Sequence, residues 1–311
     1  MKKYSRLQVA VLIPCFNEEL AIAGVVTEFR RALPEASIFV YDNGSTDKTR
    51  EVAKTAGAIV RSETRRGKGN VVRRMFADID ADVYVMVDGD GTYDAASAPA
   101  MVTRLLDDYL DMVVATRLDE VAGIFRRGHK TGNQGFAALI AALFGRQLTD
   151  VFSGYRAMTR RFVKSFPGYS TGFEIETELS IHALNIRIPM VEMPAPFGLR
   201  VEGSESKLKT TRDGIRILRI TFYFLKEVRP LLFFSCLALG FAAAALTLAY
   251  PLFVTYLRTG LVPRFPTAIL ATGLMLLAFI SAACALILDS VAALRWEAKR
   301  NAYLSEPLPP H

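Results

Sequence analysis

Residues 82–94 read DVYVMVDGDGTYD, an apolar run that ends in two carboxylates, Asp88 and Asp90, with one glycine between them. A run this uniformly apolar is typical of a strand buried on both faces of a parallel sheet. If the strand continues to Asp90, both carboxylates project to the same side, and Gly89 allows another backbone to approach closely. Two adjacent carboxylates repel each other unless a cation or a proton shares the site. The stretch therefore predicts a buried strand that delivers paired negative charge to one point.

Apolar runs of the same kind recur three times, as VAVLIPC, SIFVYDN and DMVVAT, at 9–15, 37–43 and 111–116. Segments with helical spacing of apolar residues lie between the runs, at 18–33, 47–56, 69–79 and 95–109. This alternation predicts an α/β fold with a mostly parallel, Rossmann-like sheet and helices on both faces. In such sheets ligands bind beyond the carboxyl ends of the strands.

Polar side chains follow the expected strands at that edge, namely Asn17 and Glu18, then Asp42 and Asn43, then Asp88 and Asp90. A hard divalent ion with oxygen ligands, Mg²⁺ or Mn²⁺, suits the last pair and would bridge to phosphate oxygens of a ligand. The alternative is that DGDGTYD is a solvated turn rich in Asp and Gly.

The segment from 117 to 200 is less regular. Helical patterns cover 129–147 and 171–186, and VEMPAPFG at 191–198 is expected to be an extended connector, because its prolines cannot sit inside a helix. His129 and His182 have no partner at metal-ligand spacing and are expected to be structural. Glu174 and Glu176 could line a sugar pocket or pair with basic residues, and both alternatives stay open.

Charge almost disappears in two stretches, 231–254 and 266–288, each about the ~20 residues that a helix needs to cross a bilayer. They predict two transmembrane helices, and a hydrophobic soluble hairpin is the alternative. Before them, 210–227 has apolar residues at steps of three and four beside basic ones, which predicts an amphipathic helix on the membrane surface. The start of the chain lacks a cleavage site, so no signal peptide is expected.

Basic residues flank the two apolar stretches, at 207–229 and 295–300, whereas Arg258 and Arg264 alone lie between them. This bias predicts a protein of the cell membrane with two spans and both termini in the cytoplasm. The formal net charge of +7 fits contact with an anionic leaflet. Nucleic acid is another partner of basic proteins, but the excess charge lies beside the apolar stretches, so lipid is favoured.

Four motifs occur in an order and spacing that resemble the family 2 glycosyltransferases with the GT-A fold: PCFNEE, YDNGSTDKT, GKGN and DGDG, beginning at 14, 41, 67 and 88. TDVFSGYR at 149–156 and GSESKL at 203–208 are most similar to the polyprenyl-phosphate and dolichol-phosphate sugar transferases of that family. The resemblance covers nearly the whole chain. It implies a nucleotide sugar donor and a lipid phosphate acceptor, joined at the cytoplasmic face.

The resemblance also implies roles for individual residues. Those implied for the nucleotide sugar are Pro14, Phe16, Glu18, Asp42, Asn43, Lys68, Asp88, Gly89 and Asp90. Asp88 and Asp90 match the metal motif, and Arg117 matches an arginine near the phosphates. Arg200 and Lys207 match a basic pair that contacts donor or acceptor phosphates.

Three further residues have open roles. Asp150 could position the sugar or the acceptor, or cap the turn that follows it. Arg126 and Arg127 could bind the acceptor phosphate or be a plain juxtamembrane charge pair. Two positions depart from the family pattern: Thr92 stands where mannosyl relatives often have a metal-binding Gln, and Asn43 replaces an Asp. The resemblance therefore does not identify the third metal ligand or the donor sugar.

We thus expect a GT-A domain over 1–208, an amphipathic helix over 209–229, two spans within 230–290 and a cytoplasmic tail over 291–311. The expected activity is metal-dependent transfer of a single hexose, from a UDP-glucose or GDP-mannose type of donor, to a polyprenyl phosphate, with Asp90, Asp150 and Arg117 as catalytic residues. The alternatives are a processive polysaccharide synthase and a membrane-anchored nucleotide-sugar sensor or scaffold without turnover. A homo-oligomer is left open.

Overall fold

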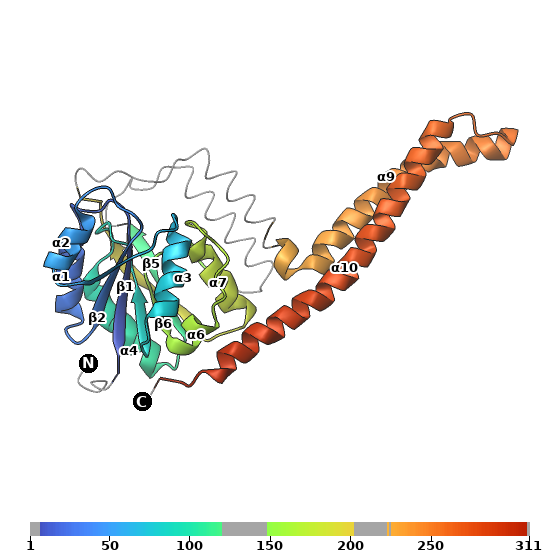
Figure 1. Ribbon diagram of the computed structural model, residues 1–311. Helices are drawn as coiled ribbons and strands as arrows, with labels where there is room; N and C mark the ends of the chain where they lie inside the picture. The colour runs from blue at the N-terminus through green and yellow to red at the C-terminus, as the bar shows by residue number, and fades with distance from the viewer. Residues whose placement is uncertain (1–6, 120–147, 202–222, 224, 310–311) are drawn as a thin grey trace. The chain divides into compact units, whose positions relative to one another are not determined.

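The computed structural model describes residues 7–119, 148–201, 223 and 225–309 (Figure 1). The chain divides into two compact units. The first, here called the sheet unit, contains Met1–Ile215 together with Ala298–His311. The second, here called the hairpin unit, contains Arg216–Glu297. The expected boundary between 208 and 209 lies outside the described residues.

The described part of the sheet unit is built on a seven-stranded mixed sheet with the order β3-β2-β1-β4-β6-β5-β7. The strands are β1 (Val9–Cys15), β2 (Ser37–Asp42), β3 (Ile59–Ser62), β4 (Val83–Met86), β5 (Met112–Asp119), β6 (Arg156–Thr159) and β7 (Met190–Phe197). Among these strands β6 alone runs antiparallel to its neighbours, β4 and β5. The expected mostly parallel sheet is confirmed.

The register brings the ends of the strands to a common edge. Cys15 at the end of β1 pairs with Asp42 at the end of β2, and Leu12 in β1 pairs with Met86 at the end of β4. Since β6 runs the other way, its first residue, Arg156, lies opposite Met86. The segments that follow β1, β2 and β4 and the segment that precedes β6 therefore meet at the carboxyl edge of the sheet.

Helices cover both faces of the sheet, as Figure 1 shows for α1 and α2 on one side and α3, α6 and α7 on the other. The helices are α1 (Ile22–Ala32), α2 (Thr49–Thr55), α3 (Lys68–Asp78), α4 (Ala98–Asp107), α6 (Arg160–Ser165) and α7 (Ile175–Asn185), with a 3₁₀ turn at Ala95–Ser97 before α4. Contacts place α4 with α1 and place α3 with α6 and α7. The expected helices at 18–33, 47–56, 95–109 and 171–186 each contain one of these elements, and α3 begins one residue before the helix expected at 69–79.

Burial on both faces explains why the strands are uniformly apolar. Val11 and Ile13 belong to a core cluster with Phe29 of α1 and Leu105 of α4, whereas Leu12, which points to the opposite face, is fully buried as well. A strand with only one buried face would alternate apolar and polar residues. The run DVYVMVD has no such alternation because β4 lies in the middle of the sheet.

The prediction for 191–198 was wrong in one respect. The segment is not a free connector but the edge strand β7, which pairs in parallel with β5 from Met112↔Met190 to Asp119↔Phe197. Prolines are tolerated on an edge strand because one side of its backbone needs no ladder hydrogen bonds. The four-residue strands β3 and β6 were not expected, since such short runs carry little periodicity.

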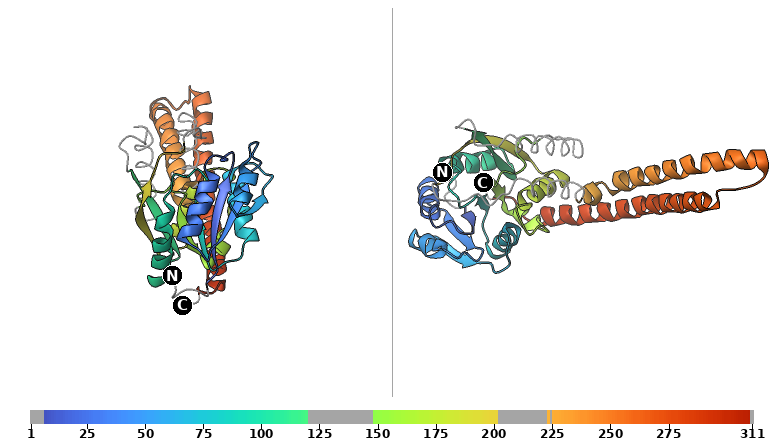
Figure 2. Two further views of the ribbon diagram at one scale, coloured as in Figure 1. Left: turned by 90° about the vertical axis from the view of Figure 1, so that its left-hand side faces the viewer. Right: turned by 90° about the horizontal axis from the view of Figure 1, so that it is seen from above.

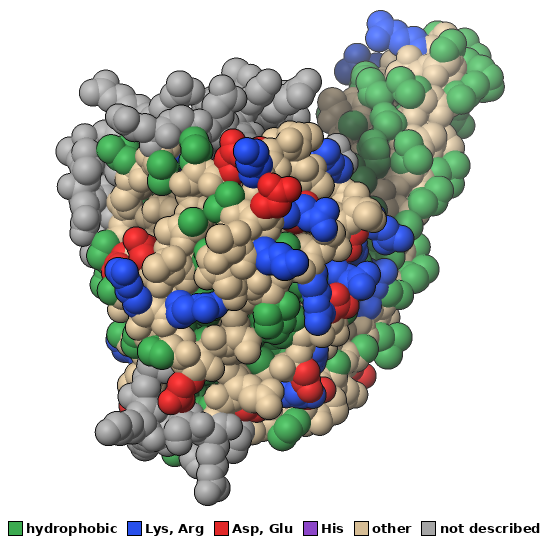
Figure 3. Space-filling model, turned by 60° about the vertical axis from the view of Figure 1, so that its left-hand side comes forward, with side chains coloured by type: hydrophobic (Ala, Val, Ile, Leu, Met, Phe, Trp, Pro, Cys, Tyr) green, Lys and Arg blue, Asp and Glu red, His purple; other side chains and the backbone are tan. Residues whose placement is uncertain are grey.

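The hairpin unit contains two long helices, α9 (Pro230–Thr259) and α10 (Phe265–Ser305), and α10 ends in the sheet unit. They run antiparallel side by side (Figure 2, right) and apolar side chains cover most of their visible surface (Figure 3). Both are long and apolar enough to cross a membrane, with a mean hydropathy of 2.3 over 18 residues. The expected apolar stretches fall within them. The helices expected at 129–147 and at 210–227 lie outside the described residues, apart from a short helical end at 225–228.

Candidate active site

The two carboxylates of the DGDG motif follow β4 at the carboxyl edge of the sheet. Gly89 between them is required by packing, because a Cβ there would lie 2.5 Å from Sγ of Cys15 at the end of β1. The atoms nearest to that position are side-chain atoms of Cys15, Ile13 and Ile22, so a side chain, and not another backbone, approaches Gly89 closely. β1 and β4 are neighbours, so this contact presses the Asp88–Asp90 segment against the first strand.

Asp90 is buried and both of its oxygens are engaged. Oδ1 accepts hydrogen bonds from the Thr92 hydroxyl at 2.7 Å and from the Thr92 backbone N–H at 3.2 Å. Oδ2 forms an ion pair with Nη2 of Arg200 at 2.7 Å. Thr92, which stands where relatives often have Gln, thus orients the carboxylate of Asp90.

Asp88 faces a lysine. Its Oδ1 accepts a hydrogen bond from Nζ of Lys68, and the same ammonium pairs with Oε1 of Glu176. On its other side Asp88 lies against Gly154, where a Cβ would come within 2.6 Å of Oδ2. Of the two roles left open for Glu176, the structure shows ion pairing.

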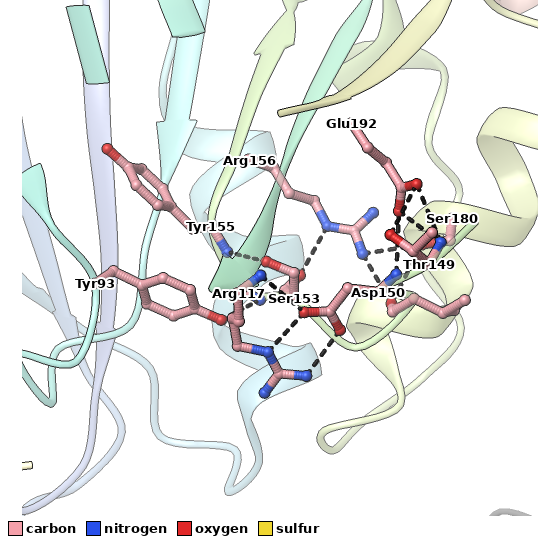
Figure 4. Close-up of polar contacts among 11 residues, drawn as sticks. Tyr93, Arg117, Thr149, Asp150, Ser153, Tyr155, Arg156, Ser180 and Glu192 are labelled. Atoms are coloured by element: carbon pink, nitrogen blue, oxygen red, sulfur yellow. Dashed lines mark hydrogen bonds and ion pairs between the residues drawn. The ribbon is translucent and has the colours of Figure 1, made fainter. Parts of the chain in front are cut away.

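Arg117 and Asp150 form a bidentate pair (Figure 4). Nε of Arg117 lies 2.6 Å from Oδ2, and Nη2 lies 2.7 Å from Oδ1. Burial lowers the pKa of Arg117, but the hydrogen bonds and charge of Asp150 outweigh it, so the pKa is raised and the guanidinium stays charged. The Glu192 carboxylate in turn accepts from the backbone N–H groups of Thr149 and Asp150, which holds Asp150 toward Arg117.

Arg156 is a site residue that the sequence motifs did not predict. It is fully buried and donates to the carbonyls of Ser153 at 3.0 Å, Val151 at 3.0 Å and Glu176 at 2.9 Å (Figure 4). Burial lowers its pKa to about 10, still well above neutral. Arg156 therefore ties the 149–154 loop to α7. The signal for it was present, because it ends the TDVFSGYR segment.

Hydrogen bonds connect the segment after β1 to the segment after β2 and order the second segment itself. The backbone N–H of Glu18 donates to the Thr49 hydroxyl, and the backbone N–H groups of Gly44 and Ser45 donate to the Asp42 carboxylate. The guanidinium of Arg66 lies over the ring of Phe16, 4.7 Å from the ring centroid. Phe16, Glu18 and Asp42, which were predicted to contact the donor, therefore lie on these two segments, and Pro14 lies in β1.

Asn43 holds the next loop. Its side-chain amide donates to the carbonyls of Glu63 at 3.0 Å and Arg65 at 2.8 Å, and its oxygen accepts from the backbone N–H of Gly67 at 2.6 Å. In the described structure its amide therefore bonds to backbone and helps to place the turn before Lys68.

Four of the highlighted residues lie outside the described residues: Arg126, Arg127, His129 and Lys207. His182, expected to be structural, is buried in α7 between the rings of Phe162 and Phe166. Its Nε2 lies 3.3 Å from the Ser165 hydroxyl.

A divalent ion would find two carboxylates at this edge. Within 7–119, 148–201 and the described C-terminal residues, no group of three or more His, Cys, Asp or Glu side chains is placed to hold a metal. Mg²⁺ typically binds through one or two carboxylates, keeping waters and taking substrate phosphate oxygens as its other ligands. The pair of Asp88 and Asp90 fits that mode and does not fit an all-protein cage.

Comparison with known proteins identifies the family. Residues 10–166 match the family model for glycosyl transferase family 2, a range that includes Asp88 and Asp90 and all but the first residue of the strands β1 to β6. The chain belongs to glycosyl transferase family 2. It is therefore a glycosyltransferase, and the resemblance in the sequence motifs is confirmed.

Relatives extend this assignment over most of the chain. Glycosyltransferase AglJ of Haloferax volcanii is 36% identical over 250 residues, which is 80% of this chain and 81% of the relative. A dolichyl-phosphate hexose transferase of the same organism is 29% identical and covers 70% of this chain and 93% of its own.

A solved structure confirms the GT-A fold. The glucosyl-3-phosphoglycerate synthase of Mycobacterium tuberculosis, in a complex with Mn²⁺ and UDP-glucose, superimposes with a TM-score of 0.56 at 22% identity. The match covers 71% of this chain and 78% of the synthase. At this identity the likeness concerns the fold alone.

Proposed function

We propose that this glycosyltransferase moves one hexose from a nucleotide diphosphate sugar to a polyprenyl phosphate at the cytoplasmic face of the membrane. The observation that carries the proposal is the charged carboxyl edge, where Asp88 and Asp90 lie with the cations Lys68 and Arg200. The same chain contains two helices suited to cross a bilayer, where a polyprenyl chain resides. Relatives named for transfer of hexose to dolichyl phosphate support the choice of acceptor.

Asp88 and Asp90 would hold Mg²⁺ or Mn²⁺ with the donor diphosphate. The ion would supply positive charge that stabilises the departing diphosphate. Arg200, paired with Asp90, would add positive charge beside that ion for a phosphate of the donor or the acceptor. Arg117, held in place by Asp150, provides a second fixed positive charge near the edge.

The acceptor needs little activation. A phosphate monoester has a second pKa near ~6, so at neutral pH the acceptor is largely dianionic and already nucleophilic. One of its oxygens forms a bond to the anomeric carbon of the sugar, while the bond from that carbon to the diphosphate oxygen breaks and the nucleoside diphosphate leaves with the electron pair. Positioning and charge stabilisation then account for catalysis, and no general base is required.

The test is to incubate membranes that contain the protein with a panel of radiolabelled nucleotide sugars and then to extract lipids. We expect one donor to give a labelled lipid that releases its sugar in mild acid. Asp90→Asn should reduce the rate at least about a hundredfold, because it removes one of the two carboxylates that would hold the divalent ion against the donor diphosphate. Asp108→Asn, an identical change at an exposed position on the far end of α4, should leave the rate unchanged.

Three outcomes would contradict the proposal. A long water-insoluble polymer in place of a single-sugar lipid would indicate a processive synthase. Donor binding without any transfer would indicate a sensor. Full turnover in excess chelator would remove the divalent ion from the reaction.

A further inference from the structure

Lys68 is a buried cation whose position the donor-binding hypothesis does not explain. Its side chain is only 8% exposed and lies between the carboxylates of Asp88 and Glu176. It is the first residue of α3, and a cation is unfavourable at a helix N-terminus, which carries partial positive charge. The two carboxylates compensate for that placement. Burial lowers the pKa of Lys68, but Asp88 and Glu176 outweigh it and raise the pKa, so the ammonium stays charged.

Backbone atoms of the protein fill the space beside the two glycines that flank Lys68. The turn is therefore not shaped around a phosphate. A Cβ at Gly67 would lie 2.1 Å from the carbonyl oxygen of Thr171, and a Cβ at Gly69 would lie 2.2 Å from that of Ser170. Loops that cradle phosphate do so with free backbone N–H groups. Here the N–H of Gly67 donates to Asn43 at 2.6 Å, and the N–H of Gly69 donates to Thr171 at 3.1 Å.

The loop on the other side of this turn is also fixed. The backbone N–H groups of Tyr169 and Ser170 donate to the carboxylate of Glu178, both at 2.7 Å. Glu178 and Glu176 belong to the same helix, α7. The turn at Gly67–Gly69 is therefore clamped between Asn43 and the 169–171 loop, and this clamp sets the direction of the Lys68 side chain.

Asp88 is in turn held from two sides. Lys68 engages its Oδ1, and the backbone of Gly154 lies close to its Oδ2. Asp88 itself comes after β4 has ended at Met86, so the ladder hydrogen bonds of the sheet do not fix it.

We propose that Lys68 is a positioning residue that acts through Asp88, and that it is not a ligand of the donor diphosphate. It anchors the Asp88 carboxylate to α7 through Glu176 and so holds one half of the carboxylate pair ready for the metal–nucleotide complex. This inference rests on the proposed function, because it assumes that Asp88 serves the donor.

The test is a double-mutant cycle read by binding and not by turnover. Calorimetric titration of the full chain in detergent with Mn²⁺ and either GDP or UDP, whichever the wild type binds, gives the affinities of wild type, Lys68→Met, Asp88→Asn and the double variant. We expect Lys68→Met to weaken nucleotide binding about tenfold when Asp88 is present, but by less than about twofold on the Asp88→Asn background. The reason is that the effects of two residues that act through each other are not additive. Lys54→Met, which removes an exposed lysine from α2, is the control and should leave the nucleotide affinity unchanged on both backgrounds.

Lys68→Met leaves Glu176 buried without its cation, which is strongly destabilising in general. If thermal unfolding shows that this variant does not fold, Lys68→Met combined with Glu176→Gln takes its place in the cycle, since it leaves no unpaired buried charge. The same non-additivity with Asp88→Asn is expected.

The outcomes separate the two hypotheses. Equal tenfold losses on both backgrounds would show that Lys68 contacts the phosphates directly and would overturn the inference alone. An Asp88→Asn variant that binds as tightly as the wild type would also overturn it, because Lys68 would then have nothing to act through. A wild-type chain that binds neither nucleotide with Mn²⁺ would overturn the proposed function and the inference together.

Discussion

Asn43 shows how a single side chain can be dictated by the backbone around it. The family motif that the sequence resembles has Asp at this position, whereas here the side chain donates two hydrogen bonds, to the carbonyls of Glu63 and Arg65. A carboxylate cannot donate and would instead face two carbonyl oxygens. The residue that departs from the family pattern is therefore the one that fits the 63–67 loop.

Asn43→Asp should lower the free energy of unfolding of the sheet unit by about 2 to 3 kcal/mol, because two buried hydrogen bonds become repulsive contacts. Urea titration in detergent, followed by circular dichroism, measures the change. Asn301→Asp makes the same chemical change at an exposed position of α10 and should stay within about 0.5 kcal/mol of wild type. Equal stability of Asn43→Asp and wild type would show that the loop adapts to a carboxylate.

His182 should make the stability of the sheet unit depend on pH. Burial, helped by the charge of Lys299, lowers its pKa from 6.5 to about 3. As the pH falls below 6.5, the ring is protonated in the unfolded chain but not in the folded protein, so stability is lost progressively until about pH 3. Between pH 7 and pH 4.5 this one group should remove about 2.5 kcal/mol.

The measurement compares urea unfolding of wild type and His182→Phe at several pH values. Phe fits the aromatic surroundings formed by Phe162 and Phe166 and cannot titrate. The difference in unfolding free energy between the two proteins should shift by about 2.5 kcal/mol across this range. Parallel pH profiles would mean that the ring is protonated in the folded protein as well.

At the scale of elements, the last turns of α10 pack as part of the sheet unit. Tyr303 is 3% exposed and its hydroxyl donates to Asp111 at 2.7 Å, directly before β5. Arg161 pairs with the same carboxylate through two contacts of 2.6 Å and lies over the Tyr303 ring. Arg300 donates to the carbonyl of Ile186 at the end of α7. The end of the chain therefore closes the edge of the sheet opposite the carboxylates.

Tyr303→Ala should cost about 3 to 5 kcal/mol of stability, as expected for removal of a buried aromatic side chain. Tyr303→Phe keeps the ring and loses one hydrogen bond to a charged group, so about 1.5 to 3 kcal/mol is expected. Tyr109→Phe, at an exposed position, is the matched control and should have little effect. Thermal unfolding of the three variants tests this, and unchanged midpoints for both Tyr303 variants would show that the tail does not contribute to the sheet unit.

At the scale of the whole molecule, the chain joins a polar α/β unit to a pair of apolar helices. Basic residues precede α9 and recur toward the end of α10, and the 260–264 connection carries Arg264 alone. This asymmetry underlies the proposal that both termini are cytoplasmic, because positive loops stay on that side. A polyprenyl phosphate has its headgroup at the membrane surface, within reach of an enzyme unit on the same side.

Cysteine accessibility in intact cells tests the topology. Cysteines introduced at Ser5 and Ser305 should resist a membrane-impermeant thiol reagent until the cells are opened. Leu261→Cys, between the two helices, should react at once and serves as the control for labelling. Labelling of either terminal position in intact cells would contradict the proposed orientation.

The sequence by itself was enough to predict four of the strands inside the sheet, β1, β2, β4 and β5, because burial on both faces makes a run such as 82–88 apolar throughout, whereas the short interior strand β6 was missed. It was also enough to predict the two long apolar helices and the residues at the strand ends, since both depend on local composition. The resemblance to the family rested on four short motifs, which need no tertiary structure to be read, and the match to the family model confirmed it.

Only the tertiary structure decided how those residues are used. The pairing of Lys68 with Asp88 and Glu176 joins positions 20 and 108 residues apart, and the contact of Tyr303 with Asp111 spans 192 residues. No local pattern records such contacts, because any buried charge can be satisfied by several partners and the packing of the whole chain selects one. The edge strand β7 and the role of Asn43 were missed for the same reason: both depend on hydrogen bonds to backbone that is distant in sequence.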